Sequence, residues 1–234
     1  MRKYNYYLIL TLGIILSCNN KPNNPEHVAE KPTNVSNTST EVKKKETKKT
    51  ILFFGDSLTA GYGLDEEESF PSLVQNRLDS LGYEYISVNG GLSGETTAGG
   101  KGRIDWVLEQ PVDIFVLELG ANDMLRGLDI KSTRQNLEDI LDAVKKAYPE
   151  VQLIIAGMLA PPNMGADYAN EFQSIFKDLA TEYNAGLIPF LLSGLETRPD
   201  LILADGKHPN ADGQKVVLEN VWEVLKGYLK SSQS

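Results

Sequence analysis

The sequence predicts an α/β fold built around a mainly parallel sheet. Four short apolar runs end at Gly, at Asn or at Glu-Leu-Gly, which is typical of strands that are buried on both faces. Stretches with helical periodicity separate these runs. Strands that alternate with helices form βαβ units, in which the strands run parallel and the functional loops lie at their carboxyl ends.

Each expected element has its own signal in the sequence. The first run, Ile51-Leu52-Phe53-Phe54, is apolar throughout rather than alternating, so a buried strand is expected there. The longest helical pattern carries apolar residues at three- and four-residue spacing, and Asn210 is a candidate N-cap for the last helix. In chain order the expected elements are strand 51–54, helix 70–81, strand 86–88, strand 114–117, helix 130–148, strand 153–156, helix 172–183 and helix 211–229.

The first 17 residues have the pattern of a signal peptide. Arg2 and Lys3 precede an apolar stretch, residues 6–16, that spans only about half of the roughly 20 residues a transmembrane helix needs. The end of the stretch, Ile15-Leu16-Ser17-Cys18, resembles a bacterial lipobox, in which the cysteine is acylated and becomes the first residue. Cys18 is the single cysteine of the chain and cannot form an internal disulfide. We therefore expect lipidation at Cys18, with an incidental cysteine in a signal peptide as the alternative.

Residues 18–49 are expected to form a flexible linker behind the lipid anchor. They are rich in Asn, Pro, Glu, Lys, Thr and Ser and contain almost no large apolar residue, so they cannot bury enough surface to offset chain entropy. Lysine clusters in this stretch could bind nucleic acid or lipid headgroups, but the formal charge of the chain is −9, and −11 without Arg2 and Lys3. A solvated linker and no nucleic-acid partner are therefore expected. The folded domain is expected at 50–230, with a short tail at 231–234.

Polar residues follow the expected strands at their carboxyl ends. Ser57 lies in the loop after the first strand, Gly94 after the second and Asn122 after the third, while Asp205 and His208 precede the last helix. Parallel strands place such loops at one edge of the sheet. In a doubly wound sheet the four loops converge.

Three other kinds of site compete for these loops. A dinucleotide-binding loop would need glycine where Asn89 stands, and a phosphate-binding P-loop would need glycine where Glu95 stands, so neither motif is present. His208 is the only histidine of the expected domain, because His27 lies in the linker. A histidine-rich metal site is therefore excluded, whereas binding of a hard cation by Asp side chains stays open.

The remaining chemistry is acyl transfer to a serine. Ser57 lies at a strand-to-helix turn that can expose its hydroxyl, His208 could remove the hydroxyl proton, and Asp205 could orient the imidazole, as a serine triad requires. The candidate donors to the oxyanion are the backbone N–H groups of Ser57 and Gly94 and the side-chain amide of Asn122. Taken singly, such residues are more often turn, hinge or capping residues. Their occurrence together with the only available histidine favours a hydrolase.

Four blocks of sequence carry a family resemblance: Gly55-Asp56-Ser57-Leu58, Gly94, Gly120-x-Asn122-Asp123 and Asp205-x-x-His208. Their order and positions resemble those of the GDSL or SGNH hydrolase family, over residues 51 to about 229. Segments 118–127 and 159–165 resemble in particular the bacterial arylesterase, acyl-CoA thioesterase and lysophospholipase branch, although this branch often has glycine in place of Ala121. The resemblance implies a three-layer α/β/α, flavodoxin-like fold and a Ser, Gly, Asn, His site with Asp205 as the partner of His208.

These observations predict a serine esterase that hydrolyses acyl esters or thioesters through an acyl-enzyme intermediate on Ser57. No metal and no organic cofactor are expected. Apolar residues of segments 158–164 and 189–195 are candidates to line an acyl pocket, although core packing explains Phe190, Leu191 and Leu192 equally well. A carbohydrate O-deacetylase of the same fold and a catalytically silent, lipid-anchored binding protein are the alternatives.

The remaining expectations concern placement and supporting residues. The lipid on Cys18 would hold a monomeric domain in the bacterial cell envelope. The outer membrane or periplasm is favoured because Asn19 does not match the Asp type of inner-membrane retention signal. Structural roles are expected for Asp56, which would bond to backbone near the turn, and for Asp123 and Arg126.

Overall fold

The structure, a computed structural model, describes residues 48–230. The signal peptide expected at 1–17, Cys18, the linker up to residue 47 and the tail at 231–234 lie outside the described residues. Within residues 48–230, no helix combines the length and the hydropathy that crossing a membrane requires.

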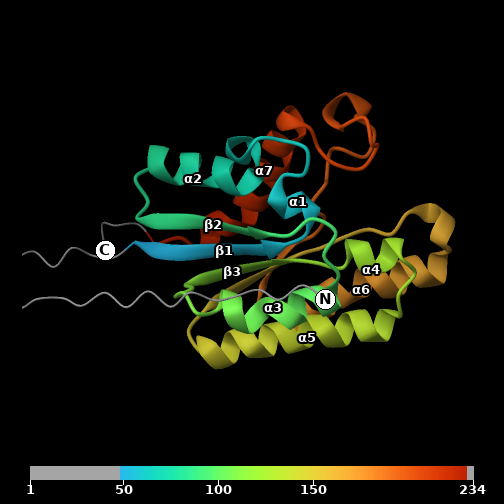
Figure 1. Ribbon diagram of the computed structural model, residues 1–234, viewed down its shortest axis with the longest axis horizontal. Helices are drawn as coiled ribbons and strands as arrows, with labels where there is room; N and C mark the ends of the chain where they lie inside the picture. Colours follow the sequence, from blue (N-terminus) through green and yellow to red (C-terminus); the bar gives the residue numbers. More distant parts are fainter. Residues whose placement is uncertain (1–47, 231–234) are drawn as a thin grey trace, which may run out of the picture. The chain divides into compact units, whose positions relative to one another are not determined.

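A sheet of five parallel strands forms the centre of the domain (Figure 1). The first four strands contain the four apolar runs of the sequence, which confirms the predicted parallel sheet. The sequence does not predict the fifth strand, because three residues, one of them glycine, form too short a pattern to recognise. In the order in which they lie side by side, the strands are β2 (Tyr85–Gly91), β1 (Lys49–Gly55), β3 (Ile114–Glu118), β4 (Gln152–Ala156) and β5 (Gly186–Ile188).

Helices cover both faces of the sheet, so the three-layer α/β/α prediction is confirmed (Figure 1). One face packs against α2 (Phe70–Ser80) and α7 (Ala211–Leu225). The other face packs against three helices, which are α3 (Thr97–Val107), α5 (Ile130–Ala147) and α6 (Ala166–Glu182). The short elements are α1 (Ser57–Ala60), α4 (Ala121–Leu125) and 3₁₀ turns at Glu66–Glu68, Pro162–Met164, Pro199–Leu201 and Lys226–Tyr228.

Two helix boundaries differ from the sequence prediction. Helix α6 begins at Ala166, six residues before the expected start at Phe172, because none of its first six residues is buried and they give no apolar periodicity. Helix α7 ends at Leu225 instead of residue 229, and the chain continues as the 3₁₀ turn. The bounds of α2 and α5 agree with the prediction to within one residue.

Helix α3 is absent from the sequence prediction because three of its residues are glycines, which favour loops over helices. Its start is fixed by Thr96, whose side chain accepts a hydrogen bond from the N–H of Gly99. Close packing explains one glycine: a Cβ on Gly100 would lie 2.5 Å from a methyl carbon of Leu119. Glycine therefore lets α3 approach the sheet at this point.

The strand order places a crevice at the carboxyl ends of the central strands. The chain passes from β1 to β2 on one side, and then crosses back to β3 on the other side of β1. Loops that leave neighbouring strands in opposite directions open a crevice, which is where ligands bind in open α/β sheets. The loops after β1 and β3 carry Ser57 and Asn122, so the topology brings these two residues to the same crevice.

Burial in the apolar core predicts how much a core substitution lowers the stability of the fold. Leu141 is fully buried in α5. We expect Leu141→Ala to lower the free energy of unfolding by about 2–5 kcal/mol, because it removes buried methyl groups and leaves a cavity. Leu81→Ala is the matched control, since Leu81 is 58% exposed. Urea denaturation of both variants measures the difference, and equal losses of stability would contradict the core assignment.

Candidate active site

The turn that carries Ser57 follows β1 directly. Ser57 is the first residue of α1, and the side chain of Asp56 accepts a hydrogen bond from the N–H of Leu58 at 3.0 Å. This is the backbone bond expected of Asp56, which caps the helix. The short helix ends at Gly61, whose positive φ of 73° is a conformation that glycine adopts at little cost. The serine is thereby held at the sheet edge.

A continuous chain of contacts joins Ser57, His208 and Asp205. The Nε2 atom of His208 lies 2.8 Å from the Ser57 hydroxyl oxygen, and its Nδ1 atom lies 2.5 Å from Oδ2 of Asp205. The other carboxylate oxygen of Asp205 accepts the backbone N–H groups of Lys207 and His208 at 2.9 and 3.1 Å. The structure therefore brings together the three residues that the sequence predicts as a triad, in the connectivity such a triad requires.

The hydrogen bonds to Asp205 also fix its charge. The hydrogen bond from the His208 ring, followed by those from the backbone N–H groups of His208 and Lys207, lowers the pKa of Asp205 to about 2. Asp205 therefore stays ionised at neutral pH. An ionised partner at Nδ1 keeps the proton on that nitrogen, which leaves Nε2 as the acceptor that faces Ser57.

Tyr62 covers the imidazole, which the sequence does not reveal. The ring centroids of Tyr62 and His208 lie 4.5 Å apart, at an angle of 37° between the planes. Tyr62 follows α1 and His208 precedes α7, so the contact joins segments far apart in the chain. Only the folded structure shows that the side chain of Tyr62 limits the positions open to the imidazole.

The three candidate oxyanion donors lie beside the triad. The side-chain amide of Asn122 donates a hydrogen bond to Oδ2 of Asp56 at 2.9 Å, which leaves its second N–H to donate elsewhere. The N–H groups of Ser57 and Gly94 form no hydrogen bond with another group in residues 48–230. Ser57, Gly94 and Asn122 all line one cleft together with His208. The expected donors therefore face a common space, as an oxyanion hole requires.

Side chains from elsewhere hold the loop that contains Gly94. Arg126 donates a hydrogen bond to the carbonyl of Gly94 at 2.7 Å. Arg103 forms a bidentate ion pair with the buried Glu95 and also donates to the carbonyl of Gly90 at 2.8 Å. Asp123 is buried and accepts the N–H and hydroxyl of Thr97, which ties α4 to α3. Asp123 and Arg126 thus make the structural contacts expected of them, whereas the sequence gives no signal for Arg103.

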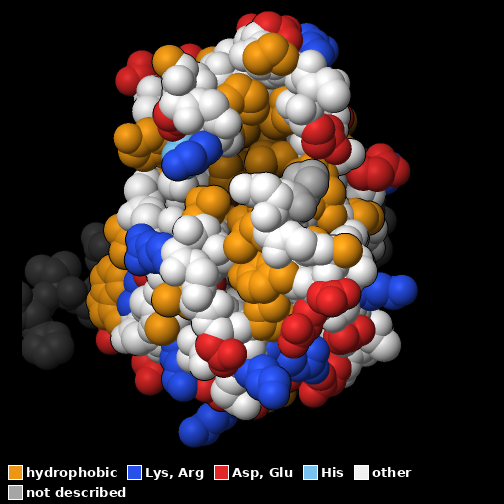
Figure 2. Space-filling model, turned by 90° about the vertical axis from the view of Figure 1, so that its right-hand side faces the viewer, with side chains coloured by type: hydrophobic (Ala, Val, Ile, Leu, Met, Phe, Trp, Pro, Cys, Tyr) orange, Lys and Arg blue, Asp and Glu red, His pale blue; other side chains and the backbone are white. Residues whose placement is uncertain are grey.

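The cleft beside Ser57 has a volume of about 540 Å³ and is mainly apolar. Figure 2 shows a hollow with orange walls, and the pale blue of a histidine side chain at its rim. Both segments proposed as acyl-pocket walls contribute to it. The apolar residues that line the cleft include Met124, Leu125, Met158, Leu159, Pro161, Phe190, Leu191 and Leu192. Leu191 is also part of the core, so both interpretations of that segment hold.

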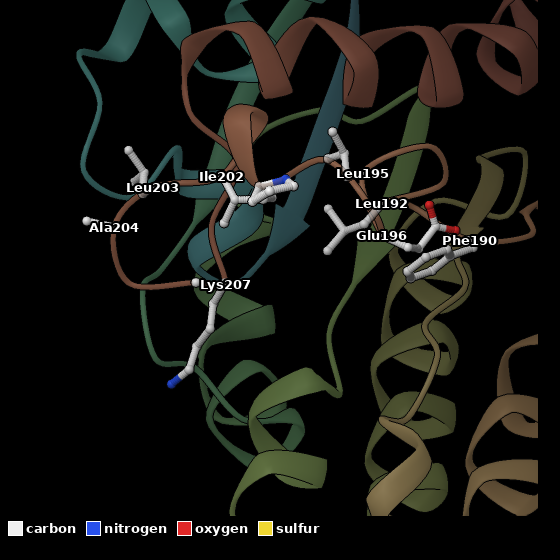
Figure 3. Close-up of a pocket in the computed structure, with 10 residues that line it drawn as sticks. Phe190, Leu192, Leu195, Glu196, Ile202, Leu203, Ala204 and Lys207 are labelled. Atoms are coloured by element: carbon white, nitrogen blue, oxygen red, sulfur yellow. The ribbon is translucent and has the colours of Figure 1, made fainter.

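A second, smaller cavity adjoins the loop that carries Asp205 and His208. Its volume is about 370 Å³, and it shares Phe190, Leu192 and Lys207 with the first cleft. Figure 3 shows the side chain of Lys207 extending away from the apolar residues Leu192 and Ile202. The two hollows therefore adjoin each other beside the loop that carries His208.

The geometry predicts the effect of removing the side-chain donor to the oxyanion. We expect Asn122→Ala to lower kcat for ester hydrolysis by about 10²–10³-fold, because one donor to the transition-state oxyanion is lost. The KM should change little, since this interaction forms mainly in the transition state. Steady-state kinetics with a soluble aryl ester would measure both constants. A rise in KM at constant kcat would show that Asn122 binds the ground state instead.

Comparisons with known proteins agree with this geometry. Residues 53–216 match the GDSL-like Lipase/Acylhydrolase family. The chain is 38% identical over 181 residues to esterase TesA of Pseudomonas aeruginosa, covering 77% of this chain and 89% of that one. It is 36% identical over 171 residues to thioesterase 1/protease 1/lysophospholipase L1 of Escherichia coli K12, covering 73% and 80% of the two chains.

A solved structure extends the similarity to three dimensions. The crystal structure of AlinE4, described as an SGNH-hydrolase family esterase, is 41% identical in sequence and superposes with a TM-score of 0.65, covering 79% of this chain and 98% of that one. The fold that the resemblance implied is thus confirmed. From the sequence match and the shared fold, the chain belongs to the GDSL-like lipase/acylhydrolase family and is an ester hydrolase.

Proposed function

We propose that this protein hydrolyses acyl esters or thioesters through an acyl-enzyme intermediate on Ser57. The observation that carries the proposal is the chain of contacts from Ser57 through His208 to Asp205, at 2.8 and 2.5 Å. A serine hydroxyl is a weak nucleophile at neutral pH unless a base is positioned to remove its proton. His208 is the base, and Asp205 orients it.

The proposed reaction has two stages. His208 takes the Ser57 proton while the oxygen attacks the ester carbonyl, and the N–H donors of Ser57, Gly94 and Asn122 stabilise the oxyanion. The intermediate collapses to the acyl-enzyme as His208 gives its proton to the departing alcohol or thiol. In the second stage His208 activates a water molecule, which releases the acid and restores Ser57. Asp205 remains ionised throughout and stabilises the imidazolium.

The cleft supports an apolar acyl group as the substrate. Its walls, which include Met158, Leu159 and Phe190, suit a chain longer than acetyl by burying apolar surface. The relatives named esterase and thioesterase 1/protease 1/lysophospholipase L1 support esters, thioesters and lysophospholipids as substrate classes. The carbohydrate O-deacetylase of the same fold is the alternative substrate class, whereas the family match argues against a catalytically silent binding protein.

A substrate panel separates these candidates. Rates should be measured with an aryl ester, an acyl-CoA, a lysophospholipid and an acetylated sugar, each at several acyl lengths where the class allows it. We expect the highest kcat/KM for acyl chains longer than acetyl. Preference for the acetylated sugar would overturn the proposed substrate class, and a lack of turnover on all four would contradict the proposed function.

We also propose that a lipid on Cys18 holds the domain in the bacterial cell envelope, with the outer membrane or periplasm favoured. The lipobox-like segment and the polar composition of residues 18–49 support this proposal. Mass spectrometry of the mature N-terminus should find a diacylated or triacylated Cys18, and an unmodified cysteine there would overturn it.

A monomer suffices for the proposed activity. The described residues of a single chain supply the nucleophile, the base, its Asp partner and the candidate oxyanion donors. Analytical ultracentrifugation of the full chain in detergent, with activity measured on the same sample, should give the mass of one chain. Activity confined to a larger species would contradict the proposal.

A further inference from the structure

Glu118 lies buried beneath the turn that carries Ser57, and no step proposed above uses it. It is the last residue of β3 and is 1% exposed. Its Oε2 atom accepts three hydrogen bonds: from the N–H of Asp56 at 3.1 Å, from the N–H of Thr59 at 3.3 Å and from the Thr59 hydroxyl at 2.7 Å. These donors flank Ser57 in the chain on both sides. One carboxyl oxygen therefore holds the backbone before and after the nucleophile.

The glycine of the Gly-Asp-Ser turn makes room for this carboxyl group. Gly55 and Glu118 are paired in register between β1 and β3. A Cβ on Gly55 would lie 2.5 Å from Oε2 of Glu118 and 2.1 Å from the Thr59 hydroxyl oxygen. Both distances are too short for non-bonded atoms. The conformation of the turn thus depends on a bare backbone at Gly55 and on a polar acceptor at Glu118.

The second carboxyl oxygen of Glu118 indicates that the group carries a proton. Oε1 is buried and has no hydrogen-bond partner among residues 48–230. Burying a charged oxygen without a donor costs much more free energy than burying a neutral carboxyl oxygen without a partner, so the protonated form is favoured. Burial, and then the neighbouring carboxyl of Asp56, raise the pKa of Glu118 well above its ordinary value.

Asp56 is the second buried carboxyl of the pair, and it is 1% exposed. Burial raises its pKa to about 6, while the hydrogen bonds from Leu58 and Asn122 and the electrostatic effect of the nearby His208 ring oppose that rise. Arg103, which is paired with Glu95, has its Nη2 atom 3.5 Å from the Gly55 carbonyl, and Lys207 lines the same cleft as Asp56. At neutral pH the pair therefore holds its proton on Glu118, and Asp56 is the anion that receives the Asn122 amide.

We propose that Glu118 is a positioning residue that acts as a neutral acid: its Oε2 atom holds the backbone on both sides of Ser57, and its proton lets the adjacent Asp56 remain an anion that orients Asn122. The proposal rests on the proposed esterase function, because Ser57 and Asn122 are the groups that it positions. In this role Glu118 does not contact the substrate.

Two substitutions separate this role from alternatives. Glu118→Gln keeps the shape and the neutral charge, with one oxygen to accept the three bonds and an amide group to donate in place of the proton. We expect kcat within about threefold of the wild type. Glu118→Leu removes the acceptor, so kcat should fall by about 10²-fold with little change in KM, because the nucleophile is displaced. Equal losses of kcat in both variants would show that Glu118 acts as an anion. An unchanged kcat in both variants would show that Glu118 does not position the nucleophile.

Infrared spectroscopy tests the proton without any turnover. The wild-type protein at pH 8 should show the carbonyl band of a protonated carboxylic acid, and Glu118→Gln should lack that band. Its absence from the wild type would overturn the proposal even if the enzyme is active. Conversely, failure of the wild type to hydrolyse esters would contradict the proposed function while leaving the band unchanged. If Glu118→Leu does not fold, the activity of Glu118→Gln and the infrared band still test whether Glu118 is a neutral acid.

Discussion

Ser57→Ala will abolish ester hydrolysis, with kcat lower by about 10⁶-fold if the triad acts as a unit. The reason is that no other nucleophile is positioned to accept the acyl group. Within the described residues, the hydroxyl of Ser57 is the group that His208 Nε2 contacts, at 2.8 Å. Without this oxygen no covalent intermediate forms, and any residual rate comes from water attacking an ester held in the cleft. Steady-state kinetics with an aryl ester measures the loss.

A matched control and a covalent probe make this result specific. Ser93 lies one residue before Gly94 in the neighbouring loop, and no hydrogen bond joins it to His208 in the described structure, so Ser93→Ala should keep at least about a third of the activity. A fluorophosphonate should add one covalent group to the wild type and to Ser93→Ala, but none to Ser57→Ala. Labelling of Ser57→Ala on another residue would show that the nucleophile is assigned wrongly.

Three bonds between loops explain why the site is ordered before substrate binds. The His208 ring is hydrogen-bonded to the Ser57 hydroxyl, and the Asn122 amide donates to the carboxylate of Asp56. Arg126 donates to the carbonyl of Gly94. Each bond joins residues that are far apart in sequence and that belong to segments following different strands. Donors that are already oriented do not have to reorganise as charge develops in the transition state, which is the main source of electrostatic catalysis.

The sequence predicts the residues of the site better than it predicts the residues that hold them in place. Ser57, Gly94 and Asn122 are found because they follow runs that predict strands, and parallel strands carry such residues to one edge. His208 is found because no second histidine competes in the expected domain. In contrast, the contact of Tyr62 with His208 and the bonds of Glu118 depend on side-chain directions across the fold. No local pattern encodes those directions.

The same distinction applies to the secondary structure. Helix α5 is predicted within one residue because Leu137, Ile140 and Val144 repeat on the face that is buried. Helix α3 is missed because its stability comes from packing on the sheet rather than from helix propensity, which is poor for glycine. Tertiary contacts thus decide the elements for which local preference is weak.

His208→Ala is expected to lower kcat by about 10⁴–10⁶-fold, for a different reason than Ser57→Ala. The hydroxyl of Ser57 remains, but nothing removes its proton or protonates the leaving group. The substitution also removes the ring that lies against Tyr62, and we expect free imidazole to bind in its place. Added imidazole should therefore restore part of the activity of His208→Ala, with a rate that rises with imidazole concentration. It should restore none to Ser57→Ala, since the nucleophile itself is absent there.

Asp205→Asn completes this prediction by separating the base from its orientation. The pKa of Asp205 is lowered to about 2, so its carboxylate is ionised at neutral pH. Its contribution to the stability of the folded state is therefore present at neutral pH and is lost as the pH falls through about 2. Asparagine can still accept the N–H groups of Lys207 and His208 but can favour the wrong tautomer of the ring, so kcat should fall by up to about 10⁴-fold. Some activity should survive beyond that of His208→Ala, and imidazole should not increase it, because the ring still fills its site. An Asp205→Asn variant that is less active than His208→Ala would mean that the carboxylate acts on more than the histidine.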